Sequence, residues 1–314
     1  MYIIYPPNSQ EKAPLWKNTE DLHAVLDKVI SDLLDECLDI LLIPGYITNN
    51  GEKQSHLDFK EKLLPLTKNG TQVFVVPGNH DINVPTAKKY IGDKAEPVES
   101  VSAEEFAAIY SDFGYGKVVK RDTASLSYLA FINDSLWLLC FDTNRYNEYR
   151  TSSISSGRIL PQTLNWALDI LHEAKEKNID VIGMIHHGLV EHMPYQSAFF
   201  SEYLIDDWEK NAEILADNRL KIVFTGHFHA NDITSFTSPA GNTITDVETG
   251  SLAQYPFPYR LILLENNTLK INTHVVNSIP SKPQLAAEYR EKLRKQTEAS
   301  ASSKINNLNI PLPK

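Results

Sequence analysis

Short apolar runs that end in polar turns are the feature that most limits the folds open to this sequence. Four such runs occur, at 39–44, 73–77, 181–185 and 221–225. Segments with the apolar spacing of amphipathic helices lie between them, and another such segment, 22–34, precedes the first run. Continuous apolar strands that alternate with helices are typical of sheets with parallel strands. We therefore expect an α/β fold.

Other parts of the chain have the pattern of an antiparallel sheet. The apolar segments 125–132 and 135–142 are separated by Asn133 and Asp134, a pair typical of hairpin turns. Between 233 and 275, short strand-like segments alternate with Gly, Asn and Pro turns. The whole pattern predicts one mixed α/β domain with two sheets at residues 1–277, followed by a helical and polar extension at 278–314.

Composition narrows the classes of function. The formal charge of −10 argues against a general nucleic-acid-binding protein, which needs a basic surface to neutralise phosphates. A small phosphorylated substrate stays compatible with this charge, because a metal site can invert the local field. No apolar run approaches the ~18 residues that a membrane helix needs. The first ten residues lack the basic and apolar regions of a signal peptide, so we expect a cytoplasmic protein unless a signal was removed before residue 1.

The two cysteines do not suggest metal or redox chemistry. Cys37 lies in a helical pattern and Cys140 in an apolar strand pattern, and neither has a second cysteine nearby. We expect both to be plain buried thiols.

Polar side chains follow three of the apolar runs where each strand is expected to end. These residues are Asn79, His80 and Asp81 after 73–77, His186 and His187 after 181–185, and His227 and His229 after 221–225. Open α/β sheets bind ligands at the carboxyl ends of their strands. Imidazole and amide groups suit ions such as Mn, Fe and Zn. One cluster alone would fit structural histidines, but three in this order predict a shared metal site.

These motifs resemble those of the calcineurin-like metallophosphoesterases. The matching segments are Gly78–Asp81, His186-His187 and Gly226–His229, in that order, within a resemblance that runs from about residue 22 to Arg260. The flanks at 48–56 and 249–260 are similar to a bacterial branch known only as phosphohydrolases. The resemblance implies two mixed β-sheets packed as a sandwich and flanked by helices. It also implies two divalent metal ions, Mn, Fe or Zn, and a small phosphorylated substrate.

The resemblance assigns metal ligands by position. Asn79, His186 and His227 correspond to ligands of one ion, and His229 corresponds to a ligand of the other. His187 lies just past the ligand position, and we expect it to support the site or to lie beside the substrate rather than to bind metal.

Further residues are assigned to the substrate side of the site. His80 corresponds to the residue that stabilises or protonates the leaving oxygen. Asp81 corresponds to a carboxylate that orients this histidine. Tyr259 and Arg260 form either an aromatic and cationic wall for the substrate or a strand-edge turn with its aromatic rings in the core, and the sequence leaves both alternatives open.

The carboxylate motifs of the family are absent from the corresponding positions. Tyr46 replaces the aspartate of a Gly-Asp motif that bridges both ions, and Tyr5 and Pro7 replace an Asp-x-His motif. Neutral donors would then face a charge of about +4 from two divalent ions. Uncompensated charge in a cleft is costly. We therefore expect one metal ion, or none, in this chain.

Two functional hypotheses follow. The first is an enzyme, a metal-dependent phosphohydrolase that cleaves phosphomonoesters or phosphodiesters with a metal-activated hydroxide, and whose activity is impaired by the replaced ligands. The alternative is a non-catalytic pseudoenzyme that binds a phosphorylated ligand or a protein partner in the same cleft. A purely structural role for the histidines is disfavoured by their order at the ends of strands.

Overall fold

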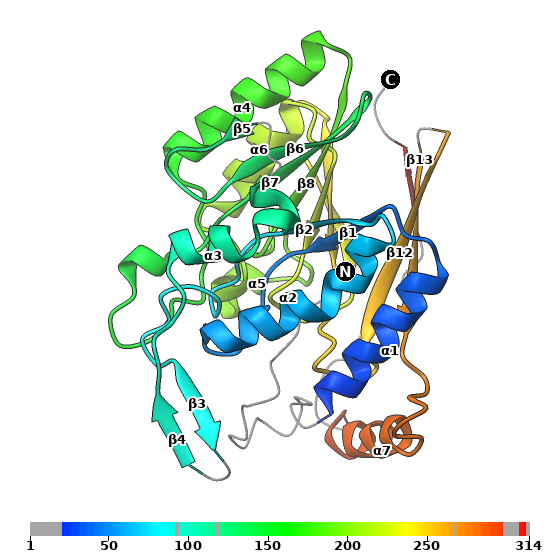
Figure 1. The fold of residues 1–314 in the computed structure, drawn as a ribbon. Helices are drawn as coiled ribbons and strands as arrows, with labels where there is room; N and C mark the ends of the chain where they lie inside the picture. The colour runs from blue at the N-terminus through cyan, green and yellow to red at the C-terminus, as the bar shows by residue number, and fades with distance from the viewer. Residues whose placement is uncertain (1–20, 92–93, 117–119, 267, 298–307, 312–314) are drawn as a thin grey trace.

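Two β-layers pack against each other, and helices cover their outer faces (Figure 1). The structure, a computed structural model, describes residues 21–91, 94–116, 120–266, 268–297 and 308–311. The larger layer is a seven-stranded sheet in the order β10 (Ile233–Thr237), β11 (Thr243–Glu248), β9 (Ile222–Thr225), β8 (Asp180–Ile185), β7 (Leu136–Phe141), β6 (Tyr128–Asn133) and β5 (Lys120–Arg121). Its centre, from β11 to β7, is parallel, and its edges are antiparallel. The expected mixed α/β architecture is confirmed.

The opposite layer contains a parallel pair and an antiparallel group. The parallel strands are β1 (Ile40–Ile43) and β2 (Gln72–Val75), joined by helix α2 (Lys53–Lys68) as the sequence predicts. The antiparallel strands are β12 (Pro258–Glu265), β13 (Thr268–Val275) and β14 (Leu308–Pro311). Helix α1 (Leu22–Asp35) packs beside α2 on this side of the molecule (Figure 1).

The remaining elements lie around the two layers. They are the hairpin of β3 (Lys88–Ile91) and β4 (Lys94–Pro97), helix α3 (Ala103–Ile109), the turn Ser111–Tyr115, the 3-10 turns Tyr146–Glu148 and Ser201–Tyr203, and helices α4 (Pro161–Glu176), α5 (Gln196–Phe199), α6 (Trp208–Asp217) and α7 (Leu285–Thr297). Helices α4 and α6 cover the outer face of the seven-stranded sheet. Pro161 begins α4, as expected from its fixed backbone angle.

Strand β7 contributes side chains to two separate hydrophobic cores. Successive side chains of a strand point to opposite faces. Leu138 and Cys140 lie in the core between the two layers. Trp137, Leu139 and Phe141 lie in the core beneath α4 and α6. A strand that is apolar at every position is therefore buried on both faces, and its carboxyl end is held rigidly between two packed cores.

Two expectations from the sequence need correction. Cys37 is exposed, whereas Cys140 is buried as expected. Helix α1 ends at Asp35, and Cys37 lies beyond it with φ of 51°, so its side chain leaves the apolar face of the helix. Strand β11 also departs from the antiparallel pattern expected for 233–275, because it pairs in parallel with β9. The predicted division at residue 277 stays a prediction.

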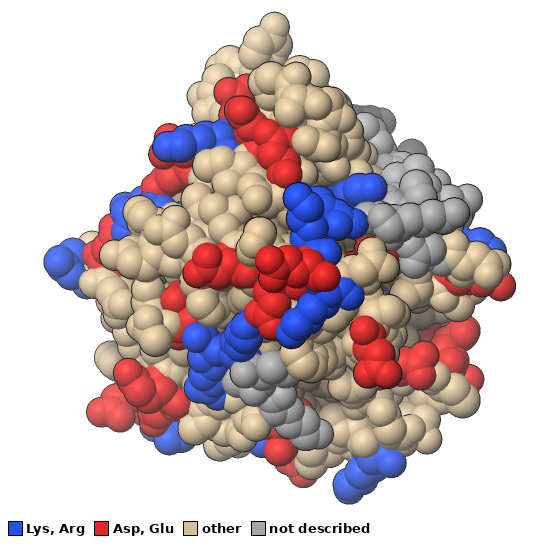
Figure 2. All heavy atoms as spheres, turned by 90° about the horizontal axis from the view of Figure 1, so that it is seen from above, with Lys and Arg blue, Asp and Glu red and all other residues tan. Residues whose placement is uncertain are grey.

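The surface charges are mixed. Figure 2 shows blue and red side chains interspersed over the face seen from above Figure 1. Ion pairs such as Lys120–Glu173 and Lys177–Glu173 contribute to this pattern on α4 and its surroundings. Within the described ranges, no helix combines the length and the apolar character that crossing a bilayer requires.

A buried hydroxyl joins the two layers and provides a test of the packing. The Tyr128 hydroxyl on β6 donates to the Val75 carbonyl oxygen on β2 at 2.9 Å. Tyr128→Phe removes this bond, and we expect the free energy of unfolding to fall by about 1 kcal/mol in urea denaturation. Tyr195→Phe is the matched control, because that side chain is 72% exposed and should leave stability unchanged. Equal stability of both variants would contradict the linking role of Tyr128.

Candidate metal centre

Loops at the carboxyl ends of β1, β2, β8 and β9 converge around one tyrosine ring. The centroid of the Tyr46 ring lies 4.6 Å from that of His186, 5.1 Å from His229, 5.2 Å from His80 and 5.3 Å from His227. Tyr46 itself is only 5% exposed. The structure therefore brings together the histidines of all three motifs that the sequence predicts, and Tyr46 lies at their centre.

Backbone carbonyl groups fix the ring nitrogens that can bind metal. The Pro44 carbonyl oxygen lies 2.6 Å from His186 Nδ1, and the Glu202 carbonyl oxygen lies 3.1 Å from His227 Nε2. A carbonyl oxygen only accepts, so each of these nitrogens carries the proton and the opposite nitrogen carries the lone pair. Burial and the neighbouring His227 hold the pKa of His186 well below its usual value, which keeps that imidazole neutral and suited to metal binding.

The donor atoms of this group have the spacing of ligands on one ion. His186 Nε2 lies 3.3 Å from Asn79 Oδ1. If the amide oxygen faces the ring, neither atom carries a proton, so the two atoms do not form a hydrogen bond. Two ligands on a tetrahedral ion with bonds of about 2.1 Å lie roughly 3.3–3.4 Å apart, which matches this distance. His186, His187 and His227 also each place one ring nitrogen within 4.8 Å of the others. Asn79, His186 and His227 therefore fit a single divalent ion.

Both ring nitrogens of His187 form hydrogen bonds with other residues of the protein. Nε2 donates to the Ser155 carbonyl oxygen at 2.9 Å, and Nδ1 accepts from the Thr143 hydroxyl at 2.7 Å. A Cβ on Gly157 would lie 2.4 Å from His187 Nδ1, so only glycine permits this close packing. Although His187 lies near His186 and His227, its hydrogen bonds describe a histidine that supports the site.

No second group of candidate metal ligands is found in the part of the chain that the structure describes. Within the described residues, His186, His187 and His227 form the one group of at least three His, Cys, Asp or Glu side chains with ligand atoms within 4.8 Å of one another, and it contains no carboxylate. His229 Nδ1 instead lies 3.3 Å from Gln254 Nε2, and its ring contacts Tyr46. Tyr5 and Pro7, where the resemblance expects further ligands, lie outside the described residues.

Asp81 ties two of the site loops together. Its carboxylate accepts hydrogen bonds from the backbone of Ile47, Thr48 and Gly78 at 2.7–3.2 Å. Burial raises the pKa of Asp81 to about 6. The role of Asp81 in orienting His80 stays a prediction, and the His80 ring is held by the hydrogen bond of 2.8 Å between its Nδ1 and the Asn49 carbonyl oxygen.

The backbone around the site adopts uncommon conformations. Tyr46, His227 and His229 have φ of 53°, 74° and 62°, in the left-handed region that non-glycine residues rarely occupy. Gly45 and Gly78 meet so closely that a Cβ on either would lie 2.6 Å from a backbone nitrogen of the facing loop. The loops that carry Tyr46 and Asn79 are therefore held in direct contact.

The loop after β7 also supports the site, although the sequence analysis did not identify it. The Tyr149 hydroxyl donates to the Asn79 carbonyl oxygen at 2.9 Å, and Asn144 Nδ2 donates to the Pro77 carbonyl oxygen at 2.6 Å. Thr143 from the same loop contacts His187. The available signal was the polar segment after the apolar run at 135–142, which follows the same strand-end pattern as the histidine motifs.

The two residues predicted to form a substrate wall lie inside the protein. Tyr259 and Arg260 are both buried. The Arg260 guanidinium donates to the Glu248 carbonyl oxygen at 2.8 Å and to the Thr273 hydroxyl at 2.8 Å. Tyr259 lies on β12 with its hydroxyl 3.4 Å from an Asp32 carboxylate oxygen on α1. These positions favour the alternative in which this segment packs in the core.

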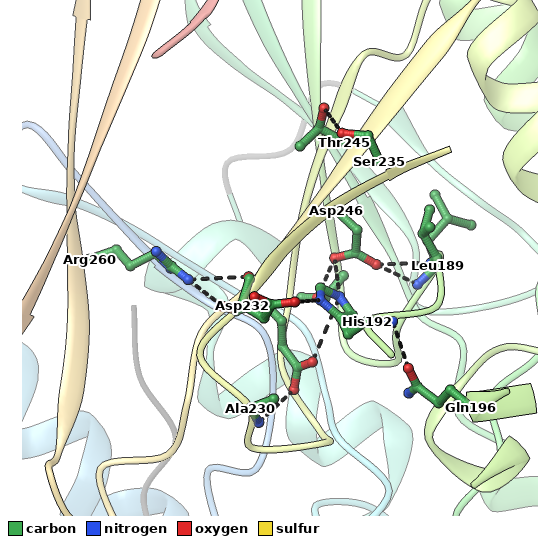
Figure 3. Close-up of polar contacts among 12 residues, drawn as sticks. Leu189, His192, Gln196, Ala230, Asp232, Ser235, Thr245, Asp246 and Arg260 are labelled. Atoms are coloured by element: carbon green, nitrogen blue, oxygen red, sulfur yellow. Dashed lines mark hydrogen bonds and ion pairs between the residues drawn. The ribbon is translucent and has the colours of Figure 1, made fainter. Parts of the chain in front are cut away.

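A buried charged cluster beside the site was missed by the sequence analysis. The His192 side chain is 1% exposed and lies 3.5–3.7 Å from carboxylate oxygens of Asp232, Asp246 and Glu248. Figure 3 shows the imidazole beside Asp232 and Asp246, with Arg260 on the far side of Asp232. The cluster joins the loop that follows His187 to β11 and to the segment that follows His229. Acidic residues within apolar strand segments were the signal for it.

Electrostatics sets the protonation of this cluster. Burial alone lowers the pKa of His192, but the attraction of Asp246, Asp232 and Glu248 outweighs it and raises this pKa to about 10. Burial raises the pKa of Glu248 to about 8. At neutral pH a protonated Glu248 leaves two cations, His192 and Arg260, beside two carboxylates. This balance makes the burial of five ionisable groups tolerable.

This chain is similar in sequence to one protein family and in fold to a solved structure. The calcineurin-like phosphoesterase family matches residues 16–231. A solved dimetal phosphatase from Danio rerio is similar with a TM-score of 0.63 at 11% identity, over 99% of this chain and 98% of that chain. A phosphopantetheinyl hydrolase from Mycobacterium tuberculosis has a TM-score of 0.37 at 14% identity, over 68% of this chain and 80% of that chain. No curated protein matches the sequence.

The cluster predicts how stability depends on pH. Above pH 6.5 the folded chain keeps on His192 a proton that the unfolded chain has lost, and Glu248 acts in the same direction between pH 4.5 and 8. Because the folded state binds more protons, the free energy of unfolding should fall between pH 7 and 8.5, by about 2 kcal/mol per pH unit. Urea denaturation in the presence of EDTA measures this slope. His192→Gln should remove about half of this slope, because Glu248 still contributes, and an unchanged slope in that variant would contradict the assignment.

Proposed function

This chain belongs to the calcineurin-like phosphoesterase family, and from this premise we propose that it is a metal-dependent phosphohydrolase that binds one divalent ion and hydrolyses phosphate esters slowly. The ion, Mn, Fe or Zn, would be held by Asn79, His186 and His227. The similar fold of a dimetal phosphatase supports phosphate-ester chemistry at this end of the sheet. We propose one ion rather than two because Tyr46 stands where a carboxylate would have to bridge the ions.

The residues of the site would have separate roles in hydrolysis. When bound, a divalent ion held by Asn79, His186 and His227 would supply Lewis acidity to the phosphate and to water. His80 is half-buried, and its Nδ1 donates to the Asn49 carbonyl oxygen, so Nε2 would transfer a proton to the leaving oxygen from the imidazolium form of the ring. Asp81 holds the loops of Tyr46 and Asn79 together, so it positions the ligands without touching the substrate.

The observation that carries the proposal is the place of the Tyr46 ring. It contacts the rings of His186, His227 and His229 at centroid distances of 4.6–5.3 Å. A bridging carboxylate would have to come from this position, and a phenol of ordinary pKa near ~10 is a poor substitute. Without a second ion, the clamp on both the attacking and the leaving oxygens is lost. Slow hydrolysis follows.

One observation favours the non-catalytic alternative. Tyr46 makes edge-on contacts with His186 and His229, a geometry that stabilises pairs of aromatic rings. Such packing holds the histidines in place without metal. A chain that binds a phosphorylated ligand or a protein partner with no turnover would use the same cleft in this state.

Metal stoichiometry tests the role of Tyr46. We expect one Mn or Zn equivalent per wild-type chain by isothermal titration calorimetry and elemental analysis. Tyr46→Phe keeps the ring and should also bind one. The triple variant Tyr5→Asp, Pro7→His and Tyr46→Asp restores the carboxylates and should bind two. Tyr46→Ala, which opens space without adding charge, separates the steric effect of the ring from the missing carboxylate. Two tightly bound equivalents in the wild-type chain would contradict the proposal.

Turnover separates the enzyme from the non-catalytic alternative. An aryl phosphate and a bis-aryl diester are assayed with added Mn, Zn or Fe. We expect slow, metal-dependent hydrolysis by the wild-type chain and an increase of about 100-fold or more in the triple variant. No turnover by the wild-type chain with any metal, together with activity in the triple variant, would establish the pseudoenzyme.

A further inference from the structure

A closed loop leaves the seven-stranded sheet directly after His186 and His187. Residues 189–203 form this loop, which returns to the place where it begins. The Gly188 amide donates to the Tyr203 carbonyl oxygen at 3.0 Å, and the Ile205 amide donates to the Gly188 carbonyl oxygen at 3.1 Å. Loops with joined ends and their own packing frequently carry function.

The base of the loop is anchored by buried polar side chains. His192 lies in the carboxylate cluster of Asp232, Asp246 and Glu248 (Figure 3). The His192 amide donates to Gln196 Oε1 at 2.7 Å, and Gln196 is fully buried. Asp246 also accepts from the amides of Leu189 and Val190 at 2.7 and 3.1 Å. These bonds fix the conformation of the loop.

The tip of the loop exposes large apolar side chains. Tyr195 and Phe199 are 72% and 74% exposed, and Met193 and Phe200 are also exposed. These four residues are half of the eight large hydrophobic side chains that are exposed in the described part of the chain. A fixed loop gains nothing from exposing them to water, and clustered exposed apolar side chains mark binding sites.

Aromatic contacts connect the tip with the metal ligands. The Phe200 ring lies 6.1 Å from that of Phe228, and Phe228 lies 4.8 Å from Tyr203. The Tyr203 ring lies 5.1 Å from that of His227, and the carbonyl oxygen of the adjacent Glu202 binds His227 Nε2. Ring contacts therefore connect Phe200 at the loop tip with the buried ligand His227.

We propose that loop 189–203, together with Phe228, binds the organic group of the phosphate ester, and that this group is a planar aromatic one. The inference rests on the proposed function, because the phosphate must lie at the ion held by Asn79, His186 and His227. A phosphate placed there leaves its ester group to extend along the aromatic surface. Stacked or edge-on aromatic contacts then select flat apolar groups over polar aliphatic ones.

Size and charge favour a small molecule over a macromolecule. A stable protein interface takes about 20–30 residues from each partner, far more than the four tip residues. Nucleic acid needs cations for its phosphates. The loop instead carries the acidic residues Glu191 and Glu202, and the chain as a whole has a charge of −10. The surface therefore suits one aromatic group joined to a single phosphate.

Two non-hydrolysable probes of different organic groups test the inference. Binding of naphthylmethylphosphonate and of methylphosphonate is measured by calorimetry with Mn present. We expect the naphthyl probe to bind the wild-type chain at least about tenfold more tightly. The double variant Tyr195→Ser, Phe199→Ser should reduce this preference to within about threefold and leave methylphosphonate binding unchanged. Both side chains are exposed, so the variant should keep wild-type stability in urea, which is measured in parallel.

A matched control removes an exposed apolar side chain elsewhere. Leu263 on β12 is 55% exposed, and Leu263→Ser should keep the full preference for the naphthyl probe. Equal affinity of the wild-type chain for both probes would overturn this inference and leave the proposed function intact. Failure of both probes to bind with Mn present would overturn the proposed function as well. If the wild-type chain sediments as a dimer and the double variant as a monomer, the tip is a self-association surface and the small-molecule assignment is wrong.

Discussion

The contact of the Tyr46 ring with four imidazoles is the interaction on which the rest of the site depends. The ring comes from the loop after β1 and its neighbours come from the loops after β2, β8 and β9, so it lies where the carboxyl ends of these strands meet. It also removes the carboxylate that would balance the charge of two ions. The same residue thus stabilises the arrangement of histidines and limits the chemistry that this arrangement can perform. We propose one ion with neutral ligands on this basis.

The loops keep their positions because buried polar groups join them in pairs. Asp81 binds the loop after β1 to the loop after β2. His192 binds the loop after β8 to carboxylates on β11 and on the segment before β10. In a low-dielectric interior these charged contacts hold only while all partners are present. The geometry of His186 and His227 is therefore fixed by residues that touch neither metal nor substrate.

Much of the fold could be predicted from the sequence, because its parallel strands are continuous apolar runs and its helices are amphipathic. The convergence of His186 and His227 follows from the same pattern, since both come after such runs. The His192 cluster could not be found in this way. Its partners Asp232 and Asp246 lie 40 and 54 positions further along the chain, and only the tertiary structure brings them together. The orientation of the Tyr46 ring likewise depends on packing that no local pattern encodes.

The most direct test is anomalous X-ray diffraction from a crystal of the wild-type chain soaked with Mn and phosphate. One anomalous peak between Asn79, His186 and His227, with phosphate beside it and the Tyr46 ring still among the histidines, is the predicted result. Two peaks bridged by an oxygen ligand, with the Tyr46 ring displaced from the centre, would contradict the account.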